Sequence, residues 1–272
     1  MGSAISAAFE RLKQRGEKAF IPFIMAGDPD LETTIRLVPE LERSGSNIVE
    51  LGIPFSDPVA DGPTIQRSSE RALRNGYRMA DYLKAIESIR RQTAVPLILF
   101  SYFNPILQYG VDNLARDARA AGADAILATD LSPEEGQEYC ASLGSHGLDP
   151  IFLVAPTSSA ERIRRIADCC RGFIYVVSRT GVTGAQDELS ATVLPTVRRV
   201  RECTRIPIAV GFGISRPDQV RAVWEIADAA VVGSALVARI EKYAGMPDLV
   251  SRAGEFCRWL LHSRSDQESS RG

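Results

Sequence analysis

The feature that most constrains this chain is an alternation of short apolar runs with longer stretches of helical periodicity. The apolar runs occupy residues 19–25, 48–51, 96–100, 125–128, 150–154, 173–177, 206–210 and 229–232. Helical stretches follow at residues 31–43, 79–91, 113–121, 134–143, 160–169, 192–202 and 216–224. Strands that alternate with helices form parallel units, and nearly continuous apolar strands are buried on both faces. Eight such runs in 272 residues predict a closed (β/α)8 TIM barrel.

Further helices are expected outside this repeat. Ile5, Phe9 and Leu12 are spaced as on one face of an amphipathic N-terminal helix. The first residues also match a myristoylation pattern, Met1-Gly2 with Ser6, but no polybasic patch accompanies it. The long gap after the second strand predicts an extra helix around residues 63–73. We expect one barrel domain over residues 1–262 and a polar, disordered tail over residues 263–272.

Composition excludes several classes of function. The net charge of -2 supplies no broad basic field for nucleic acid or anionic lipid. Five cysteines without a C-x-x-C pair and two distant histidines give no metal-ligand spacing, so no metal site is expected. We expect free thiols and a cytoplasmic protein, because no membrane span or targeting peptide is visible.

Two carboxylates stand out near the second strand. Glu50 lies within its apolar run, where partial desolvation would raise the pKa and suit the group to proton transfer. A structural acid tied to a buried donor is an equal alternative. The following loop contains three prolines and two acids, Asp57 and Asp61, which indicates fixed presentation of side chains. Asp61 could instead cap the helix that starts near Pro63.

Glycine-bearing loops follow the last three strands. A long loop at residues 178–185 contains Gly184, the next strand ends in Gly211-Phe212-Gly213, and the last ends in Gly233-Ser234 before a helix. Each fragment alone indicates only a tight turn. Together, on successive late strands, backbone N–H groups and a helix N-terminus predict a site for a phosphate-bearing substrate.

The positions of the lysines narrow the chemistry. Lys13, Lys18, Lys84 and Lys242 all lie away from the expected C-terminal ends of strands. A Schiff-base aldolase needs a lysine amine at the barrel mouth, and a metal aldolase needs a ligand cluster. General acid–base catalysis by carboxylates is therefore the expected mechanism for a phosphate ester.

Several motifs resemble those of the tryptophan synthase α family. The most specific is the run from Glu50 to Gln66, ELGIPFSDPVADGPTIQ. Others are FIPF at 20–23 with AGDP at 26–29, YFNPIL at 102–107, YVVSRTGVTG at 175–184 and GFGIS at 211–215. The resemblance covers the chain up to about residue 237. It implies a lyase that cleaves indole-3-glycerol phosphate into indole and glyceraldehyde 3-phosphate.

The resemblance also implies roles for individual residues. Glu50 would transfer protons, and Asp61 would hold the indole nitrogen. The remaining substrate-binding positions are Phe23, Tyr102, Tyr175, Thr183, Gly184, Phe212, Gly213, Gly233 and Ser234. Among these, Thr183 would position Asp61, the glycines and Ser234 would hold the phosphate, and the aromatic residues would line the indole pocket. Packing in the core is the alternative for the aromatic residues.

The family works as an α2β2 complex, in which a β subunit carries pyridoxal phosphate and receives the indole. Asp57, Asn104 and Pro133 resemble positions that face this partner. No cofactor is expected in this chain itself. Two alternatives remain: a free-standing lyase that releases indole without a β subunit, and a silent barrel that only binds a phosphate ligand or a protein. The silent barrel should have lost Glu50 or Asp61, and both are present.

Overall fold

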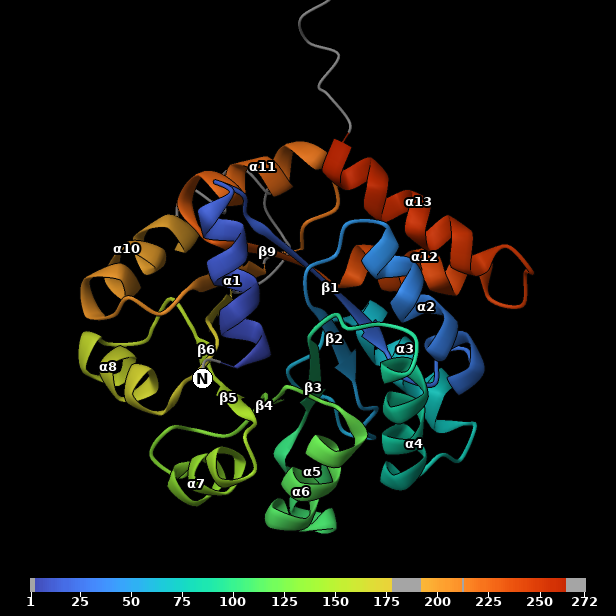
Figure 1. Cartoon of the computed structure of the whole chain (residues 1–272), viewed down its shortest axis with the longest axis horizontal. Coiled ribbons are helices and arrows are strands. Elements are labelled where there is room, and N and C mark those ends of the chain that lie inside the picture. The colour runs from blue at the N-terminus through green and yellow to red at the C-terminus, as the bar shows by residue number, and fades with distance from the viewer. Residues whose placement is uncertain (1–2, 178–191, 212, 263–272) are drawn as a thin grey trace, which may run out of the picture.

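The computed structural model describes residues 3–177, 192–211 and 213–262. A parallel sheet of nine strands occupies the centre, with helices arranged around it (Figure 1). The strands are β1 (Ala19–Met25), β2 (Val49–Gly52), β3 (Leu97–Ser101), β4 (Ala125–Ala128), β5 (Asp149–Ile151), β6 (Leu153–Val154), β7 (Ile174–Val177), β8 (Ile208–Gly211) and β9 (Ala229–Val232). These strands coincide with the eight expected runs, except that the fifth run is divided in two.

The fifth apolar run forms two short strands, β5 and β6, and the barrel closes between them. The strand order is β5-β4-β3-β2-β1-β9-β8-β7-β6, so the two outermost strands are consecutive in the chain. Only Phe152 separates them, and its carbonyl accepts a hydrogen bond from the Tyr175 amide at 3.1 Å. Residues 149–151 pair with β4, and residues 153–154 pair with β7. The predicted (β/α)8 barrel is therefore confirmed.

The helices agree closely with the expected stretches. They are α1 (Ala4–Gln14), α2 (Leu31–Arg43), α3 (Pro63–Leu73), α4 (Met79–Arg90), α5 (Phe103–Tyr109), α6 (Val111–Ala121), α7 (Gln137–Ser145), α8 (Ala160–Cys169), α10 (Leu194–Cys203), α11 (Pro217–Ile226), α12 (Ser234–Tyr243) and α13 (Leu249–His262). The sequence did not predict α5, which contains Pro105 in its first turn, where a proline has no hydrogen bond to lose. The helix α7 begins three residues later than expected, after a turn in which the Glu135 amide donates to Ser132.

Apolar residues fill two separate layers. Along β1, Ile21 belongs to a cluster inside the barrel, whereas Phe20 and Ile24 belong to the cluster between the strands and the helices. Every residue of β1 is buried, as expected for a strand covered on both faces. The inner layer continues toward the C-terminal ends of the strands with Phe23 and Phe100, whose rings meet edge to face at 5.3 Å.

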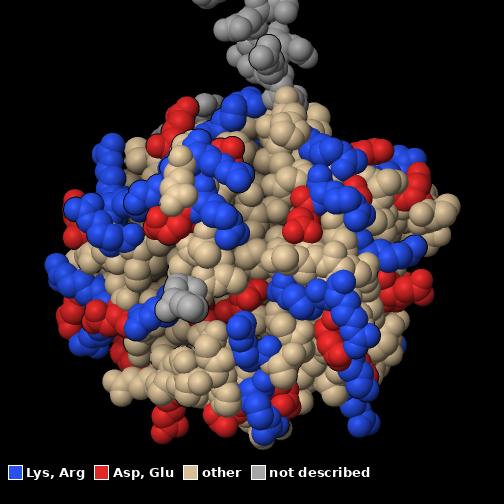
Figure 2. Space-filling view, viewed as in Figure 1, with Lys and Arg blue, Asp and Glu red and all other residues tan. Residues whose placement is uncertain are grey.

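The N-terminal helix α1 closes the opposite end of the barrel. Its apolar residues Ile5, Phe9 and Leu12 are buried and join the same cluster as Ile21 and Phe173. The expected amphipathic helix is confirmed, and it crosses the centre of the view in Figure 1. On this face, positive and negative side chains are interspersed (Figure 2).

Residues 1–2, with the possible myristoylation glycine, and the expected tail at 263–272 lie outside the described residues. Within the part of the chain that the structure describes, no helix is both long enough and apolar enough to cross a membrane.

Candidate active site

Glu50 is a fully buried acid inside the barrel. In the parallel register it lies beside Phe23 of β1 and Ile98 of β3. Neither carboxylate oxygen has a hydrogen-bond partner among the described residues, so the expected alternative of a structural acid finds no donor there. Because burial disfavours the charged form, the pKa of Glu50 is raised to about 8. At neutral pH Glu50 therefore carries a proton that it can donate.

Asp61 lies in the loop between β2 and α3, on the side of the sheet where the strands end. Its side chain is half-buried, and burial raises its pKa to about 6, although a hydrogen bond with Tyr102 acts in the opposite direction. The interpretation of Asp61 as a helix cap is wrong. The N-cap of α3 is Gly62, without a side-chain bond, and the Asp61 carbonyl accepts from Gln66 Nε2 at 2.9 Å.

The loop that carries Asp61 is fastened on two sides. Tyr102, which precedes α5, accepts a hydrogen bond from the Ala60 amide at 2.9 Å and packs its ring 5.2 Å from that of Phe55. Ser69 of α3 exchanges two hydrogen bonds with the Phe55 backbone, both at 2.9 Å. Contacts from Tyr102, between β3 and α5, and from Ser69 of α3 therefore hold the Asp61 loop in place beside Tyr102.

Two aromatic residues, Phe23 on the adjacent β1 and Tyr175 on the more distant β7, line the interior near Glu50. Burial raises the pKa of Tyr175 on β7 well above its usual value, and the negative charge of Glu50 raises it further. Glycines make room for both rings. A Cβ on Gly52 would lie 2.5 Å from Cζ of Phe23, and a Cβ on Gly211 would lie 2.6 Å from the Tyr175 hydroxyl. Phe23 and Tyr175 thus line the same interior space as Glu50.

Two of the glycines expected to hold a phosphate, Gly213 and Gly233, follow the C-terminal ends of β8 and β9. Gly233 is the N-cap of α12 and Ser234 its first residue, with no side chain capping the helix. The first N–H groups of such a helix suit an anion. Gly233 adjoins Phe23, because a Cβ on it would lie 3.6 Å from the Phe23 Cβ. Gly213 has φ of 82° and open space around its α-carbon.

Three expected site residues, Thr183, Gly184 and Phe212, lie outside the described residues. Among the residues that the structure describes, no cluster of three or more histidines, cysteines, aspartates or glutamates could hold a metal ion. The four lysines lie on α1, before β1, on α4 and on α12, away from the C-terminal ends of the strands.

The residues expected to face a partner differ in exposure. Asp57 and Asn104 are exposed, whereas Pro133 is buried within the chain itself. Two apolar side chains near the exposed pair were missed by the sequence reasoning: Val59 is 87% exposed and Leu107 is 56% exposed. An apolar residue next to the prolines of a rigid loop was the available indication, since exposed apolar groups cluster at interfaces.

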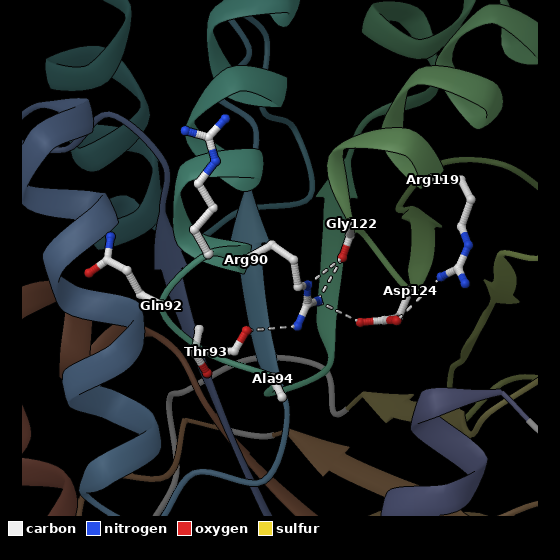
Figure 3. Close-up of a pocket in the computed structure, with 8 residues that line it drawn as sticks. Arg90, Gln92, Thr93, Ala94, Arg119, Gly122 and Asp124 are labelled. Carbon is white, nitrogen blue, oxygen red and sulfur yellow. Dashed lines mark hydrogen bonds and ion pairs between the residues drawn. The ribbon is translucent and has the colours of Figure 1, made fainter.

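A wide depression of about 620 Å³ lies at the other end of the barrel, between α4, α6 and the starts of β3 and β4. Arg90 occupies it and donates to the carbonyls of Thr93, Val95 and Gly122 and to the carboxylate of Asp124 (Figure 3). The guanidinium donors are thus directed at the protein's own acceptors. Arg90 therefore links the segment before β3 to the segment before β4, and its role in this depression is structural.

The chain is similar over most of its length to proteins of one family. A family model described as "Tryptophan synthase alpha chain" matches residues 9–261. The tryptophan synthase alpha chain of Geotalea uraniireducens is 51% identical over 254 residues, which are 93% of this chain and 95% of that protein.

Two solved structures share the fold. Tryptophan synthase subunit alpha from Legionella pneumophila has a TM-score of 0.87 and 38% identity, covering 96% of this chain and 97% of that one. A chain of the tryptophan synthase complex from Pyrococcus furiosus has a TM-score of 0.82 and 36% identity, covering 89% and 97%. Because the family model spans most of the chain and the relatives match at nearly full length, this chain belongs to the tryptophan synthase alpha chain family.

Proposed function

We propose that this chain cleaves indole-3-glycerol phosphate into indole and glyceraldehyde 3-phosphate. The observation that carries the proposal is the difference between two acids at one end of the barrel. Glu50, with a pKa of about 8, is protonated at neutral pH, whereas Asp61, with a pKa of about 6, is mostly ionised. One chain therefore offers a proton donor and an anion to the same substrate.

The reaction breaks the bond between C3 of the indole ring and the hydroxyl-bearing carbon of the glycerol chain. Glu50 donates its proton to C3, which makes the ring an electron sink. The resulting carboxylate then accepts the proton of the adjacent hydroxyl as the C–C bond breaks and the aldehyde forms. The proton count balances, because C3 gains one proton, the hydroxyl loses one, and Glu50 returns to its starting state.

Asp61 acts at the other side of the ring. As a carboxylate it accepts the hydrogen bond of the ring N–H and stabilises the positive charge that develops when C3 is protonated. Phe23, Tyr102 and Tyr175 supply apolar surface for the ring. Gly213, Gly233 and Ser234 offer backbone N–H groups to the phosphate, together with Gly184, while Thr183 and Phe212 complete the expected set.

The test is a direct assay of indole release by the purified chain. Glu50→Gln keeps the shape of the side chain but cannot donate the proton, and we expect kcat to fall about 10³-fold. Asp61→Asn should also lower kcat strongly. Glu87→Gln, on the outer surface of α4, is the matched control and should keep full activity. Unchanged turnover in Glu50→Gln would contradict the mechanism, and an inactive unmodified chain would contradict the proposed function.

We further propose that the chain acts with a β subunit, which contains the pyridoxal phosphate and consumes the indole. The exposed apolar pair Val59 and Leu107 favours this reading over a free-standing lyase, together with the exposed Asp57 on the loop of Val59 and Asn104 on the helix of Leu107, whereas the buried Pro133 adds no support. Adding a β subunit should stimulate indole formation. Leu107→Glu should reduce this stimulation more than it reduces turnover of the isolated chain, and a chain that shows no stimulation would instead be a free-standing lyase.

A further inference from the structure

An ion-pair cluster joins three segments at the C-terminal end of the barrel: the loop after β1, α3 and α12. Arg71 of α3 lies at its centre. Its Nε and Nη2 donate to the two carboxylate oxygens of Asp28 at 2.9 and 2.7 Å. Its Nη1 donates to Oε1 of Glu241, on α12, at 2.7 Å. One guanidinium therefore binds two carboxylates from two different segments, and we name these three residues the Arg71 cluster.

The cluster is shielded on the Asp28 side and open on the Glu241 side. The Asp28 side chain is 1% exposed, that of Arg71 22% and that of Glu241 31%. Ser68 also donates to Asp28, and Asn75 donates to the carbonyl of Gly27 at 3.0 Å. Ser68 and Arg71 lie on one face of α3, and Asn75 lies just beyond its C-terminal end, so this face and the end of the helix are both bound to the loop after β1.

Each fastened helix leads directly to one part of the proposed site. Asp61 precedes Gly62, the N-cap of α3, and Gly233 with Ser234 starts α12. The two helices also pack together, because Ile65 of α3 and Val237 of α12 belong to one buried cluster with Phe23. Glu241 lies two turns along α12 from its N-terminus, where the bond to Arg71 holds that helix against α3.

We propose that Arg71 and Glu241 are positioning residues that fix the separation between the carboxylate of Asp61 and the N-terminus of α12. This inference rests on the proposed function. The substrate carries its phosphate and its indole ring at opposite ends, so both sites must lie at the distance that the substrate spans. A displacement of about 1 Å between such sites can cost on the order of 10²-fold in rate. The separated products do not carry this requirement, since each occupies one site alone.

The experiment removes the bonds between Glu241 of α12 and helix α3, and leaves the buried Arg71–Asp28 pair in place. Glu241→Ala breaks the contact between α12 and Arg71, while the Arg71–Asp28 pair remains. Glu241→Gln is the conservative variant, because its amide oxygen can still accept a hydrogen bond. Arg67→Ala is the matched control: Arg67 also binds Glu241, at 3.0 and 2.9 Å, but its side chain is 51% exposed and it does not reach Asp28. Arg71→Lys tests the central residue of the cluster, because one ammonium group cannot reproduce the two parallel bonds to Asp28 together with the bond to Glu241.

The measurements are kcat and KM for indole-3-glycerol phosphate and the inhibition constants of indole and of glyceraldehyde 3-phosphate measured separately. We expect Glu241→Ala to lower kcat/KM about 10-fold, with both inhibition constants within about twofold of the unmodified chain. Glu241→Gln should recover part of the loss, Arg71→Lys should resemble Glu241→Ala, and Arg67→Ala should match the unmodified chain.

Three results would overturn the inference. Unchanged kcat/KM in Glu241→Ala would show that the bond between Arg71 and Glu241 does not affect turnover. An equal loss of affinity for the separate products would show damage to the individual sites rather than to their separation. An equal effect of Arg67→Ala would assign the link between α3 and α12 to the exposed Arg67–Glu241 pair rather than to the Arg71 cluster. An unmodified chain without lyase activity would instead remove the proposed function, and this inference with it.

Discussion

Two buried carboxylates at opposite ends of the barrel, Asp124 and Glu50, have opposite surroundings. At the N-terminal end of the strands, Asp124 accepts hydrogen bonds from Arg90 and from the Leu97 amide, both at 2.9 Å, and Arg119 lies 3.6 Å away. At the C-terminal end, Glu50 is buried without a hydrogen-bond partner among the described residues. The satisfied acid stabilises the fold, whereas the bare acid costs stability and keeps a proton available. The difference separates an acid that holds two segments together from an acid proposed to react.

The sharpest test of this contrast is the pH dependence of stability in Glu50→Gln. Burial raises the pKa of Glu50 from 4.5 to about 8, so the folded chain holds a proton that the unfolded chain loses between these values. The unmodified chain should therefore lose stability relative to Glu50→Gln as the pH rises from 4.5 to 8, by roughly 4 kcal/mol. Urea unfolding of both proteins across this pH range measures the difference in their free energies of unfolding. A difference that does not change with pH would show that Glu50 titrates normally.

At the opposite end, we expect Arg90→Met to destabilise the chain by about 3 kcal/mol, because it leaves Asp124 and three carbonyls without their donor. Turnover of the folded enzyme should not change. Arg91→Met is the control: its side chain is 73% exposed and pairs only with Glu87 on the surface, so its effect should stay below about 0.5 kcal/mol. Equal urea midpoints for Arg90→Met and Arg91→Met would show that the bonds of Arg90 to Asp124 and to the three carbonyls do not stabilise the fold.

A smaller effect is expected where α1 enters the barrel. Ser3 caps α1 by accepting from the Ser6 amide at 3.1 Å, and its hydroxyl donates to Asp149. Ser3→Ala should cost about 1–2 kcal/mol. Ser159 caps α8 on the outside in the same manner, at 3.2 Å to Arg162, without a bond to a buried acid. Thermal unfolding should therefore show a larger loss for Ser3→Ala than for Ser159→Ala, and the reverse order would contradict the role of Asp149.

The smallest expected effect is a shift in a pH profile. The hydrogen bond from Tyr102 lowers the pKa of Asp61 against the effect of burial. Tyr102→Phe removes this bond, so the pKa of Asp61 should rise, and the acid limb of the kcat/KM profile should move upward by roughly half a pH unit. The alkaline limb, assigned to Glu50, should stay near pH 8. Movement of both limbs together would show that the two acids do not act independently.

Much of the barrel could be predicted because its strands are buried on both faces and its helices have local start signals. The helices α2 and α8 have the expected bounds, since Asp30 and Ser159 cap them with their own side chains. The sheet break at Phe152 could not be predicted, because it depends on which strands lie on either side. The short helix α5 was missed because Pro105 reads as a break unless the start of the helix is known.

The site could be predicted only where a residue stood out within its own segment of the sequence. Glu50 stood out as a charged residue inside an apolar run, and its complete burial agrees with that position. The Arg71 cluster left no such pattern, because its three members are far apart in the chain and arginines on helices are common. The burial of Pro133 was also not foreseen. Residue type and spacing identify groups on one element, whereas pairs across elements emerge only from the packing.

The N-terminal helix has a consequence for the order in which the molecule can be completed. The ribosome makes α1 before the segments that cover it, since Phe9 lies in one buried cluster with Phe173 and Ala209. The apolar face of α1 is therefore completely covered only after these later segments have joined the barrel. Burial of α1 marks the end of assembly rather than its beginning.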